Sequence, residues 1–388
     1  MKNVLIITTV SGFLEKFEKN NVKILQEMGY TVHYAANMKE QHYLYDEEIL
    51  KSKGVITHHI DIEKSPYMIK NNLKAYKQLK QIVKDNYITM LHCHTPVGGL
   101  LGRMVGRVCG KNKVKTIYTA HGFHFYKGAP LLNVTLYKSV EHLMARNTDA
   151  LVLINDEDYQ YGKKLRLRKG GKIYKIPGIG LDLERFKPFS QETIEQKRKE
   201  LNIEPDECMI VSVGELNENK NQRVILEAME QLIAENYHGG KIKYFICGDG
   251  FYNDKIETWI NEMKLENHVI KCGYQRDIRT ILGCADAFVF PSKREGLGMA
   301  GLEALAMGIP AVVADNRGTK EYIVDGENGY VCKNNAASEY AENIKKAFAM
   351  TAEQKAKMKE ACGITVQDFE QGKTTKIMKK VYKEAEKL

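Results

Sequence analysis

The chain has 388 residues, of which 43% are hydrophobic and 28% are charged. This length exceeds the roughly 250–300 residues at which a single hydrophobic core stops growing, so two domains are expected. The composition excludes a disordered or a fibrous protein and is typical of a globular one.

The excess of positive charge lies in the first half of the chain. Residues 1–180 carry 28 Lys and Arg against 15 Asp and Glu, whereas the rest of the chain carries 30 against 34. Two interpretations stay open: a solubilising surface, or a face attracted to an anionic membrane or a phosphorylated acceptor. Nucleic acid is not among the expected partners.

The sequence predicts a cytoplasmic protein. The chain begins Met1-Lys2-Asn3 and enters an apolar run at once, without the core or the cleavage site of a signal peptide. No run approaches the ~18 uninterrupted apolar residues of a membrane span. The eight cysteines form no C-x-x-C pair and no metal-like spacing with His, so reduced thiols are expected.

In the first half, short β-branched and aromatic runs alternate with helical patterns, which predicts βαβ units and a parallel sheet. The predicted strands are Val4–Thr9, Thr31–Ala35, Ile56–Ile60, Met90–Cys93, Lys115–Tyr118, Ala150–Ile154 and Lys172–Ile176. Between them lies a basic helix whose apolar stripe is Ile69, Leu73, Tyr76, Leu79 and Val83. We interpret this stripe as facing the core, with a membrane anchor as the alternative.

A break at Pro177-Gly178-Ile179-Gly180 precedes a second alternation of the same kind. Its predicted strands are Met209–Val213, Lys243–Cys247, Val269–Cys272, Ala287–Phe290, Ala311–Ala314 and Tyr330–Cys332. The expected fold is α/β, with Rossmann-like, doubly wound parallel-sheet domains at residues 1–180 and 181–370 that face each other across a cleft. Residues 371–388 are expected to form a helix that packs back on the N-terminal domain.

The strongest local motif lies at residues 290–310, FPSKREGLGMAGLEALAMGIP. A strand ends at Phe290, a glycine-containing loop follows, and a helix opens near Met299. Glycines allow backbone amides to approach a ligand, and a helix N-terminus attracts anions, so this pattern suits a diphosphate. Glu295 in the loop and Glu303 about one turn into the helix could accept hydrogen bonds from a polyol. The alternative is a glycine turn with two solvated glutamates.

Two further glycine turns follow strands. The first begins at Gly214 and contains Lys220, a candidate counter-charge for a phosphate or simply a solvated lysine. The second is Gly248-Asp249-Gly250.

Taken in order, these segments resemble the family 4 retaining glycosyltransferases of the GT-B fold. The resemblance rests on G-E-L-x-x-x-K at 214–220, the G-D-G turn, x-G-Y at 272–274, the E-x7-E pair and residues 303–331. It extends to HCHTPVGGLLGRM at 92–104, YTAHGFHFYKGAP at 118–130 and IPGIGLDLERFKP at 176–188. Members that build bacterial surface polysaccharides or lipid-linked oligosaccharides are the most similar in these motifs.

The resemblance implies the following roles in the C-terminal half. Glu295 would contact the donor sugar, and Gly296, Leu297 and Gly298 would offer amides to the diphosphate. Glu303 would hold the ribose hydroxyls, and Lys220 would neutralise the β-phosphate.

It also implies that Gly214 and Gly248 lie against the nucleotide, and that the main chain at Cys272, Gly273 and Tyr274 faces the base. In the N-terminal half, Gly12 would approach the diphosphate, and His121 would lie close to the donor sugar and the acceptor. Glu295, His121 and Lys220 are the expected catalytic residues.

One position departs from the family pattern. Many relatives carry Arg after the glycine of the phosphate-binding turn, whereas this chain carries Glu215. Glu215 is therefore expected to point elsewhere, or Arg185, Arg223 or Arg294 to replace the missing cation. Because no D-x-D signature is present, we expect no metal and no cofactor, with helix amides and Lys220 at the diphosphate.

The expected activity is transfer of a hexose or N-acetylhexosamine from a nucleotide diphosphate sugar, with UDP as the expected nucleotide. The resemblance implies retention at the anomeric carbon, with a saccharide or polyprenyl-diphosphate-linked acceptor in surface polysaccharide synthesis. The aromatic segment 122–128 either packs under its loop or meets a sugar or an isoprenoid chain. Arg103, Arg107 and Lys127 would then form a docking face for an anionic membrane at the inner face of the cell membrane.

Three alternatives remain at this point. A nucleotide-sugar 2-epimerase would share the architecture, although the E-x7-E pair argues against it. A non-catalytic nucleotide-sugar binding protein is suggested by Glu215. A nicotinamide oxidoreductase is the weakest, because no G-x-G-x-x-G follows the first strand.

Overall fold

The fold is taken from a computed structural model, which describes the chain except residues 1, 41–42, 44, 110–113 and 126–130, and except the side chains of residues 131–133. It divides into two compact units. Unit 1 comprises residues 1–180 and 372–388, and unit 2 comprises residues 181–371.

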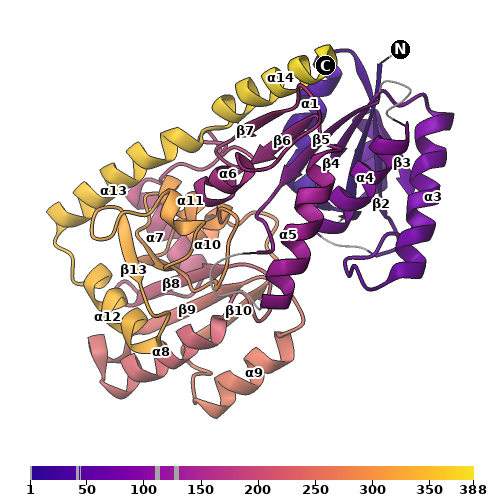
Figure 1. The fold of residues 1–388 in the computed structure, drawn as a ribbon. Coiled ribbons are helices and arrows are strands. Elements are labelled where there is room, and N and C mark those ends of the chain that lie inside the picture. Colours follow the sequence, from indigo (N-terminus) through magenta and orange to yellow (C-terminus); the bar gives the residue numbers. More distant parts are fainter. Residues whose placement is uncertain (1, 41–42, 44, 110–113, 126–130) are drawn as a thin grey trace. The chain divides into compact units, whose positions relative to one another are not determined.

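Unit 1 contains a seven-stranded parallel sheet in the order β3-β2-β1-β4-β5-β6-β7, with helices packed against it (Figure 1). Its elements are β1 (Lys2–Val10), the π-helix η1 (Leu14–Glu18), α1 (Lys19–Glu27), β2 (Tyr30–Asn37), α2 (Glu47–Ser52), β3 (Val55–His59), α3 (Ile69–Asp85), β4 (Met90–Cys93), α4 (Pro96–Cys109), β5 (Lys115–Ala120), α5 (Leu131–Ala145), β6 (Ala150–Leu153), α6 (Asp156–Gly162), β7 (Lys172–Lys175) and α14 (Gln371–Lys387). The central strands are buried on both faces, as the continuous apolar runs of parallel strands require.

Unit 2 contains a six-stranded parallel sheet in the order β10-β9-β8-β11-β12-β13. Its elements are α7 (Gln191–Glu200), β8 (Cys208–Val213), α8 (Gln222–Ala234), η3 (Tyr237–Gly240), β9 (Ile242–Cys247), α9 (Asn253–Glu262), β10 (Val269–Gly273), α10 (Arg279–Leu282), β11 (Ala287–Phe290), α11 (Met299–Ala306), β12 (Ala311–Ala314), η4 (Thr319–Glu321), β13 (Gly329–Cys332), α12 (Ala337–Phe348), α13 (Ala352–Val366) and η5 (Gln367–Phe369). In both sheets the carboxyl ends of the strands carry the loops singled out above, because parallel strands place those ends at one edge.

The C-terminal helix α14 packs on the sheet of unit 1. Its Glu386 accepts from Lys2 Nζ at 2.8 Å and from the Tyr30 hydroxyl at 2.7 Å, and its Tyr382 is fully buried. The two ends of the chain are therefore joined within one unit (Figure 1).

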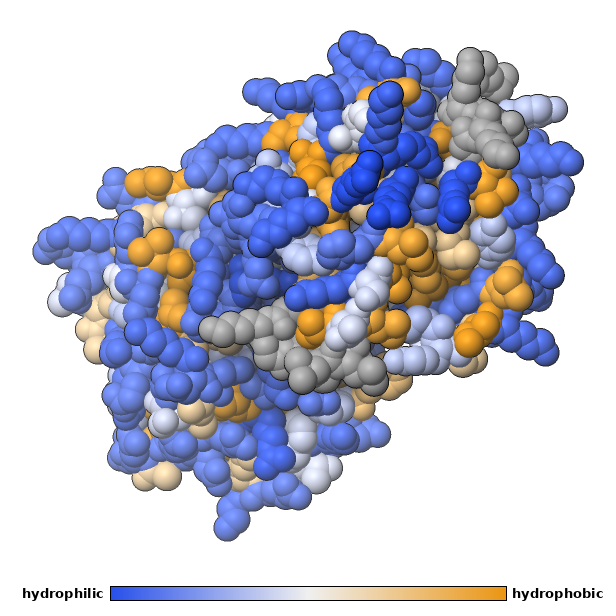
Figure 2. Space-filling model, in the orientation of Figure 1, coloured by the Kyte–Doolittle hydropathy of each residue, from blue (hydrophilic) through white to orange (hydrophobic). Residues whose placement is uncertain are grey.

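The apolar stripe predicted for α3 is wrong at its N-terminal end. Ile69 and Leu73 are 73% and 54% exposed, whereas Asn72 and Ala75 are buried. Asn72 can take a core-facing position because its amide donates to the Ser65 carbonyl and accepts from the Glu63 amide. Figure 2 shows apolar residues of this kind, in orange, on a surface that is otherwise largely hydrophilic.

Within the described part of the chain, every helix is too short or too polar to cross a bilayer. All eight cysteines are free thiols.

Candidate functional site

The loop between β11 and α11 is shaped by Gly298, which caps the helix at a φ of 86°. A Cβ on this residue would lie 2.6 Å from the Phe290 ring, so a side chain is excluded by space as well as by backbone conformation. The helix therefore begins without a side-chain cap on its first amides, which is the arrangement that favours an anion. Leu297 is buried, so only its main chain could meet a ligand.

Lys220 and Glu295 form an ion pair at this loop. Lys220 Nζ lies 2.6 Å from Glu295 Oε1, and the two side chains are 21% and 12% exposed. The ammonium also lies 5.0 Å from the centroid of the Phe290 ring. A partly buried ammonium held by one carboxylate oxygen retains donors for a further anion, because Lys carries three N–H groups.

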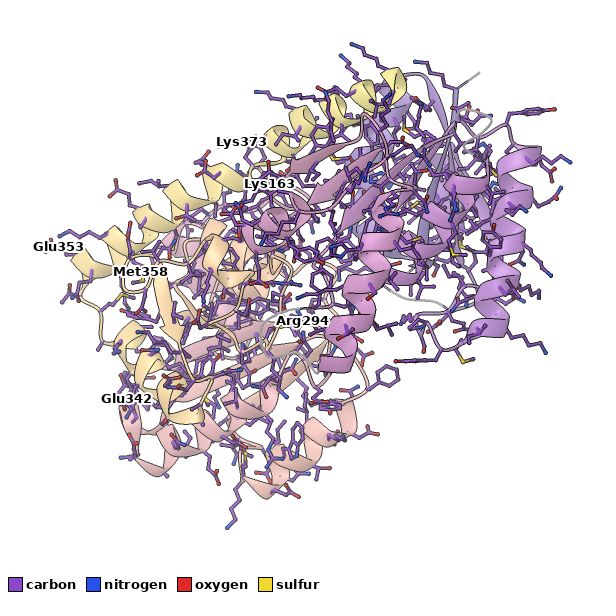
Figure 3. All side chains as sticks on the ribbon, viewed as in Figure 1. Lys163, Arg294, Glu342, Glu353, Met358 and Lys373 are labelled. Atoms are coloured by element: carbon purple, nitrogen blue, oxygen red, sulfur yellow. The ribbon has the colours of Figure 1, made fainter. Side chains whose placement is uncertain are left out.

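Two hydrogen bonds to backbone carbonyls join the loop after β8 to the loop after β11. Asn219 Nδ2 donates to the Arg294 carbonyl at 2.9 Å, and the Lys293 amide donates to the Asn219 carbonyl at 2.8 Å. The position of Lys220 relative to Glu295 is therefore determined by two loops from neighbouring strands. Arg294, in the second of these loops, is labelled in Figure 3.

The glycine turns after β8 and β9 are packed directly on one another. A Cβ on Gly248 would lie 1.8 Å from the Gly214 carbonyl oxygen, and the Gly214 amide donates to the Cys247 carbonyl. A Cβ on Gly214 would meet the stem of Lys220 at 3.2 Å. These glycines allow the close approach that brings Lys220 across the turn.

The main chain after β10 is open at Gly273, which has a φ of 63° and no heavy atom within 4 Å of an added Cβ. Tyr274 beside it is 42% exposed. Cys272 precedes them and hydrogen-bonds the Cys247 thiol; this contact, with burial, raises the pKa of Cys247.

Glu303 lies half-buried in the second turn of α11, and Gly296 is half-buried in the loop before it. Glu215 is half-buried, and its carbonyl accepts from Gln222 Nε2 at 3.2 Å. Among the three cations considered as replacements for Arg at position 215, Arg294 lies in the loop that carries Glu295.

The other two cations are engaged elsewhere in unit 2. Arg223 pairs with Glu227 at 2.9 Å and lies over the Trp259 ring. Arg185 lies 3.8 Å from Asp277.

In unit 1, Gly12 is buried directly after β1, and its carbonyl accepts from the Lys16 amide within the turn that leads into η1. His121 follows β5, and its ring meets Phe13 edge-on with the centroids 5.2 Å apart. Burial lowers the pKa of His121 to about 4, so its imidazole is neutral at physiological pH.

Three buried side chains around His121 escaped the sequence interpretation: Glu18, His92 and His94. His94 Nδ1 lies 3.1 Å from His121 Nε2, and Glu18 Oε1 lies 3.4 Å from His94 Nδ1. The signal was the alternation His92-Cys93-His94, because residues two apart in a strand point to the same face.

The predicted docking face for a membrane needs correction. Arg103 is 1% exposed and forms a buried, bidentate ion pair with Glu141, so it cannot meet a membrane. Phe123 and Phe125 are buried and stack on one another at 4.8 Å, so these two aromatic residues pack under the loop. Arg107 is exposed, and Lys127 lies outside the described residues.

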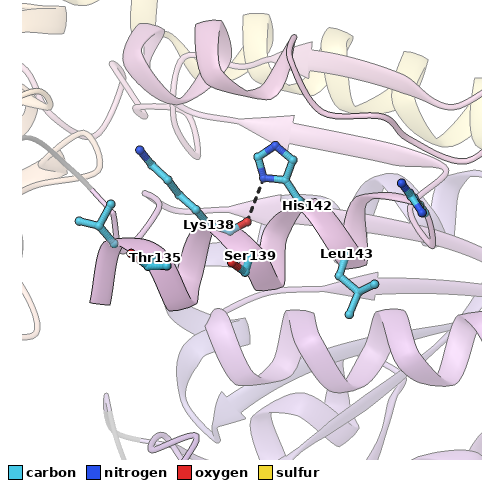
Figure 4. Close-up of a pocket in the computed structure, with 7 residues that line it drawn as sticks. Thr135, Lys138, Ser139, His142 and Leu143 are labelled. Atoms are coloured by element: carbon cyan, nitrogen blue, oxygen red, sulfur yellow. Dashed lines mark hydrogen bonds between the residues drawn. The ribbon is translucent and has the colours of Figure 1, made fainter. Parts of the chain in front are cut away.

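A surface hollow of about 660 Å³ lies instead along the exposed face of α5 (Figure 4). The basic side chains Lys138, His142 and Arg146 line it together with Thr135, Ser139 and Leu143. Their spacing of three and four residues places them on one side of the helix.

Comparison with known proteins identifies the family. A profile described as "Glycosyl transferases group 1" matches residues 193–362, and one described as "Glycosyl transferase 4-like" matches residues 4–155. A Bacillus subtilis (strain 168) protein named "Putative glycosyltransferase EpsD" is 37% identical over 89% of this chain and 87% of its own length. The chain belongs to this glycosyltransferase family. It is therefore an enzyme, and the family resemblance seen in the sequence is confirmed.

A second relative of this glycosyltransferase is named for its reaction. The Escherichia coli "UDP-Gal:alpha-D-GlcNAc-diphosphoundecaprenol alpha-1,3-galactosyltransferase" is 28% identical over 74% of this chain and 76% of its own.

Solved structures confirm the GT-B fold class of the glycosyltransferase. Anabaena Alr3699/HepE, crystallised with UDP and glucose, matches with a TM-score of 0.79 at 16% identity, covering 99% of this chain and all of that one. A glycosyltransferase from Rickettsia africae ESF-5 matches with a TM-score of 0.76 at 19% identity, covering 99% and 98%.

Proposed function

We propose that this glycosyltransferase moves a hexose or N-acetylhexosamine from a UDP-linked donor to a saccharide or polyprenyl-diphosphate-linked acceptor, with retention of anomeric configuration. The observation that carries the proposal is the Lys220–Glu295 ion pair at the opening of α11. It places a cation, a carboxylate and helix amides in one loop cluster, which is what a sugar diphosphate requires. The E. coli relative is named for a UDP-linked donor and the Anabaena protein was crystallised with UDP, and both support the choice of nucleotide.

In the proposed donor complex, Lys220 Nζ turns one of its N–H groups to the β-phosphate while Glu295 keeps another. Glu295 is thereby available to a hydroxyl of the sugar, and its own carbonyl accepts from Arg317 Nε at 3.3 Å. Glu303, one turn into α11, accepts from the ribose hydroxyls. The base stacks at the exposed main chain of Gly273 and Tyr274.

Catalysis in this proposal consists of positioning and of stabilising the leaving group. The glycosidic C–O bond to the diphosphate breaks, the acceptor oxygen bonds to the anomeric carbon from the same face, and the acceptor proton passes to the departing phosphate oxygen. Lys220 and the α11 amides stabilise the negative charge that develops on that phosphate. A fixed cation in this position supports a reaction without metal or cofactor.

The donor site is tested by thermal shift of the purified protein with UDP, GDP, ADP and their sugar conjugates. UDP compounds are expected to raise the melting temperature selectively. Lys220→Ala and Glu303→Ala should each weaken UDP-sugar binding by about 1–3 kcal/mol, because each removes hydrogen bonds to or from a charged group. Lys293→Ala is the matched control, since its ammonium is half-exposed and pairs with Glu218 on the surface.

Unchanged affinity in both variants would contradict this donor site. Binding with neither transfer nor slow donor hydrolysis would make the chain a sugar-nucleotide binding protein. Loss of transfer on adding a chelator, with recovery in Mn²⁺ or Mg²⁺, would contradict metal independence.

We further propose that unit 1 contacts an anionic membrane, at the inner face of the cell membrane, through the layer formed by α3, α4 and α5, which pack side by side. Large apolar side chains are exposed on all three helices and just before the first: Tyr67 and Met68 before α3, Ile69 and Leu73 on α3, Met104 and Val108 on α4, and Leu136 and Leu143 on α5. Lys70, Lys74, Lys77 and Arg107 are exposed among them. Apolar side chains interleaved with cations match an interface of anionic headgroups over acyl chains.

Co-sedimentation with vesicles tests this contact. Binding to vesicles containing phosphatidylglycerol is expected, with little binding to vesicles of phosphatidylcholine alone. Ile69→Asp combined with Leu73→Asp should abolish sedimentation, whereas Ile364→Asp on α13, which replaces an equally exposed residue of unit 2, should not. Equal sedimentation of all three proteins would contradict the assigned surface.

A further inference from the structure

Unit 1 brings a buried carboxyl group, a buried imidazole and a partly exposed imidazole into contact behind the first loop. Glu18 closes the π-helix η1 and is 1% exposed, and His94 directly follows β4 and is fully buried. Glu18 Oε1 lies 3.4 Å from His94 Nδ1 and 3.6 Å from His121 Nε2, while the two nitrogens lie 3.1 Å apart. These three atoms form a near-equilateral triangle. A π-turn often marks such a functional position.

The neighbouring His92 supports the triangle and does not complete a metal site. Although Glu18, His92 and His94 lie close enough together to hold an ion, both ring nitrogens of His92 are already hydrogen-bonded. Its Nδ1 contacts the Tyr382 hydroxyl at 2.9 Å and its Nε2 contacts Thr119 Oγ1 at 2.8 Å. Helix α14 thus reaches the same cluster from the other end of the chain.

The surroundings of Glu18 favour its neutral form. The titratable groups that face it are His94 and His121, with His92, Tyr34 and Tyr382 around them from β4, β2 and α14. In the described part of the chain no lysine or arginine pairs with Glu18, whose Oε2 accepts from Asn21 Nδ2 at 2.6 Å. Burial raises the pKa of Glu18 to about 8. At neutral pH the carboxyl group therefore keeps its proton.

Hydrogen-bond accounting then fixes the tautomers. His94 Nε2 is buried, and none of the described residues hydrogen-bonds it. An N–H group there would be an unsatisfied donor, which is rarer in proteins than an unsatisfied acceptor. His94 therefore carries its proton on Nδ1, from which it donates to His121 Nε2 at 3.1 Å, and the O–H of the neutral Glu18 faces that same nitrogen from Oε1 at 3.6 Å. His121 must then carry its own proton on Nδ1, on the outer edge of a side chain that is 23% exposed.

We propose that Glu18 is a positioning residue which, by remaining protonated, holds His121 as a neutral imidazole whose Nδ1–H donates to an uncharged oxygen of the sugar substrate. An ionised Glu18, its proton lost to solvent, would instead accept from both nitrogens, so that each imidazole stays neutral and His121 carries its single proton on Nε2. The proton on Nε2 would then point inward and the charge of the site would change. This inference rests on the proposed function for its substrate, but its first readout does not.

The first readout is the tautomer of His121, measured by ¹⁵N NMR of the full-length protein labelled only at histidine. The His121 signals are assigned by their absence in His121→Gln. In the wild type we expect the Nδ1–H tautomer of His121 from pH 6 to 8. Above pH 8, as Glu18 ionises, the Nε2–H tautomer should replace it. Glu18→Gln, whose amide cannot lose a proton in this range, should keep the Nδ1–H tautomer up to pH 9.5.

The second readout is donor turnover against pH. The wild type should lose roughly tenfold between pH 7 and 9.5, whereas Glu18→Gln should change less than about twofold, because the titrating group is gone. Glu15→Gln is the matched control: Glu15 lies in the same π-helix but pairs with Lys53 at the surface, so this variant should follow the wild type.

An Nε2–H tautomer of His121 at neutral pH, or identical pH profiles for the wild type and Glu18→Gln, would overturn the proposal. If Glu18→Gln fails to fold, Glu18→Leu replaces it and should likewise abolish the pH-dependent change at His121. If none of the nucleotide sugars is turned over but the tautomers are as expected, the proposed function is contradicted and the positioning role of Glu18 stands.

Discussion

The buried ion pair of unit 1 gives the most demanding prediction for stability. Both terminal nitrogens of the Arg103 guanidinium donate to the Glu141 carboxylate, at 2.6 and 3.0 Å, and Nε donates to the Gly99 carbonyl at 2.8 Å. The guanidinium carbon also lies 4.0 Å from the centroid of the Tyr118 ring. Arg103→Met preserves much of the side-chain volume but leaves a carboxylate that is 7% exposed without its cation.

We expect Arg103→Met to destabilise unit 1 by about 3–5 kcal/mol, because removing one partner of a buried pair leaves an uncompensated charge. Arg103→Met combined with Glu141→Leu should recover most of this loss, since an apolar pair of similar volume is often as stable as the ion pair. Arg107→Met, one turn further along α4 and exposed, should change stability by less than about 0.5 kcal/mol.

Urea unfolding can resolve the two units because the single tryptophan, Trp259, lies in unit 2. Tryptophan fluorescence follows unit 2, while far-UV circular dichroism follows both, so two transitions must be fitted. The midpoint of unit 1 alone should fall by roughly 1–2 M urea in Arg103→Met, given the usual dependence of unfolding free energy on urea. A loss below about 1 kcal/mol, or no recovery in the double variant, would refute the reasoning.

Three further outcomes are expected. Gly248→Ala should lower the free energy of unfolding by at least about 2 kcal/mol, because the new Cβ would lie 1.8 Å from the Gly214 carbonyl oxygen. The same variant should lose the rise in melting temperature with UDP, which a thermal-shift assay can test. Thr351→Ala should destabilise unit 2 by about 1 kcal/mol in urea, because it removes the capping box formed with Gln354. As the pH rises from 6.5 to 8, the wild type should lose stability relative to Glu18→Gln by up to about 1.4 kcal/mol per pH unit. The reason is that folding raises the pKa of Glu18 to about 8, so the native state binds more protons than the unfolded state in that range. Parallel pH-stability curves for the two proteins would contradict this last expectation.

The strands and the glycine turns were predictable from local sequence. Each predicted strand overlaps an observed one, because a run of β-branched residues between turn residues is typical of a buried parallel strand. The turns at Gly214, Gly248 and Gly298 were also predictable, because only glycine fits where other atoms approach the backbone this closely.

Side-chain partners were predictable only where a motif placed them. The sequence nominated Lys220 and Glu295 separately, and the parallel order of β8 and β11 brings their loops together at one sheet edge. Arg103 was assigned to a surface because an arginine in a basic region is usually exposed. Its burial depends on Glu141, 38 residues away, which no local pattern connects to it.

The sequence by itself determined the fold class and the loops that make the donor site, since periodicity and glycine placement are properties of a single segment. Tertiary structure alone decided which side chains share a proton or a charge. Glu18, His94 and His121 come from three separate segments, and their contact exists only because β1, β4 and β5 are neighbours in the sheet. Periodicity shows which residues of an element face the same way, but it cannot show what lies opposite them.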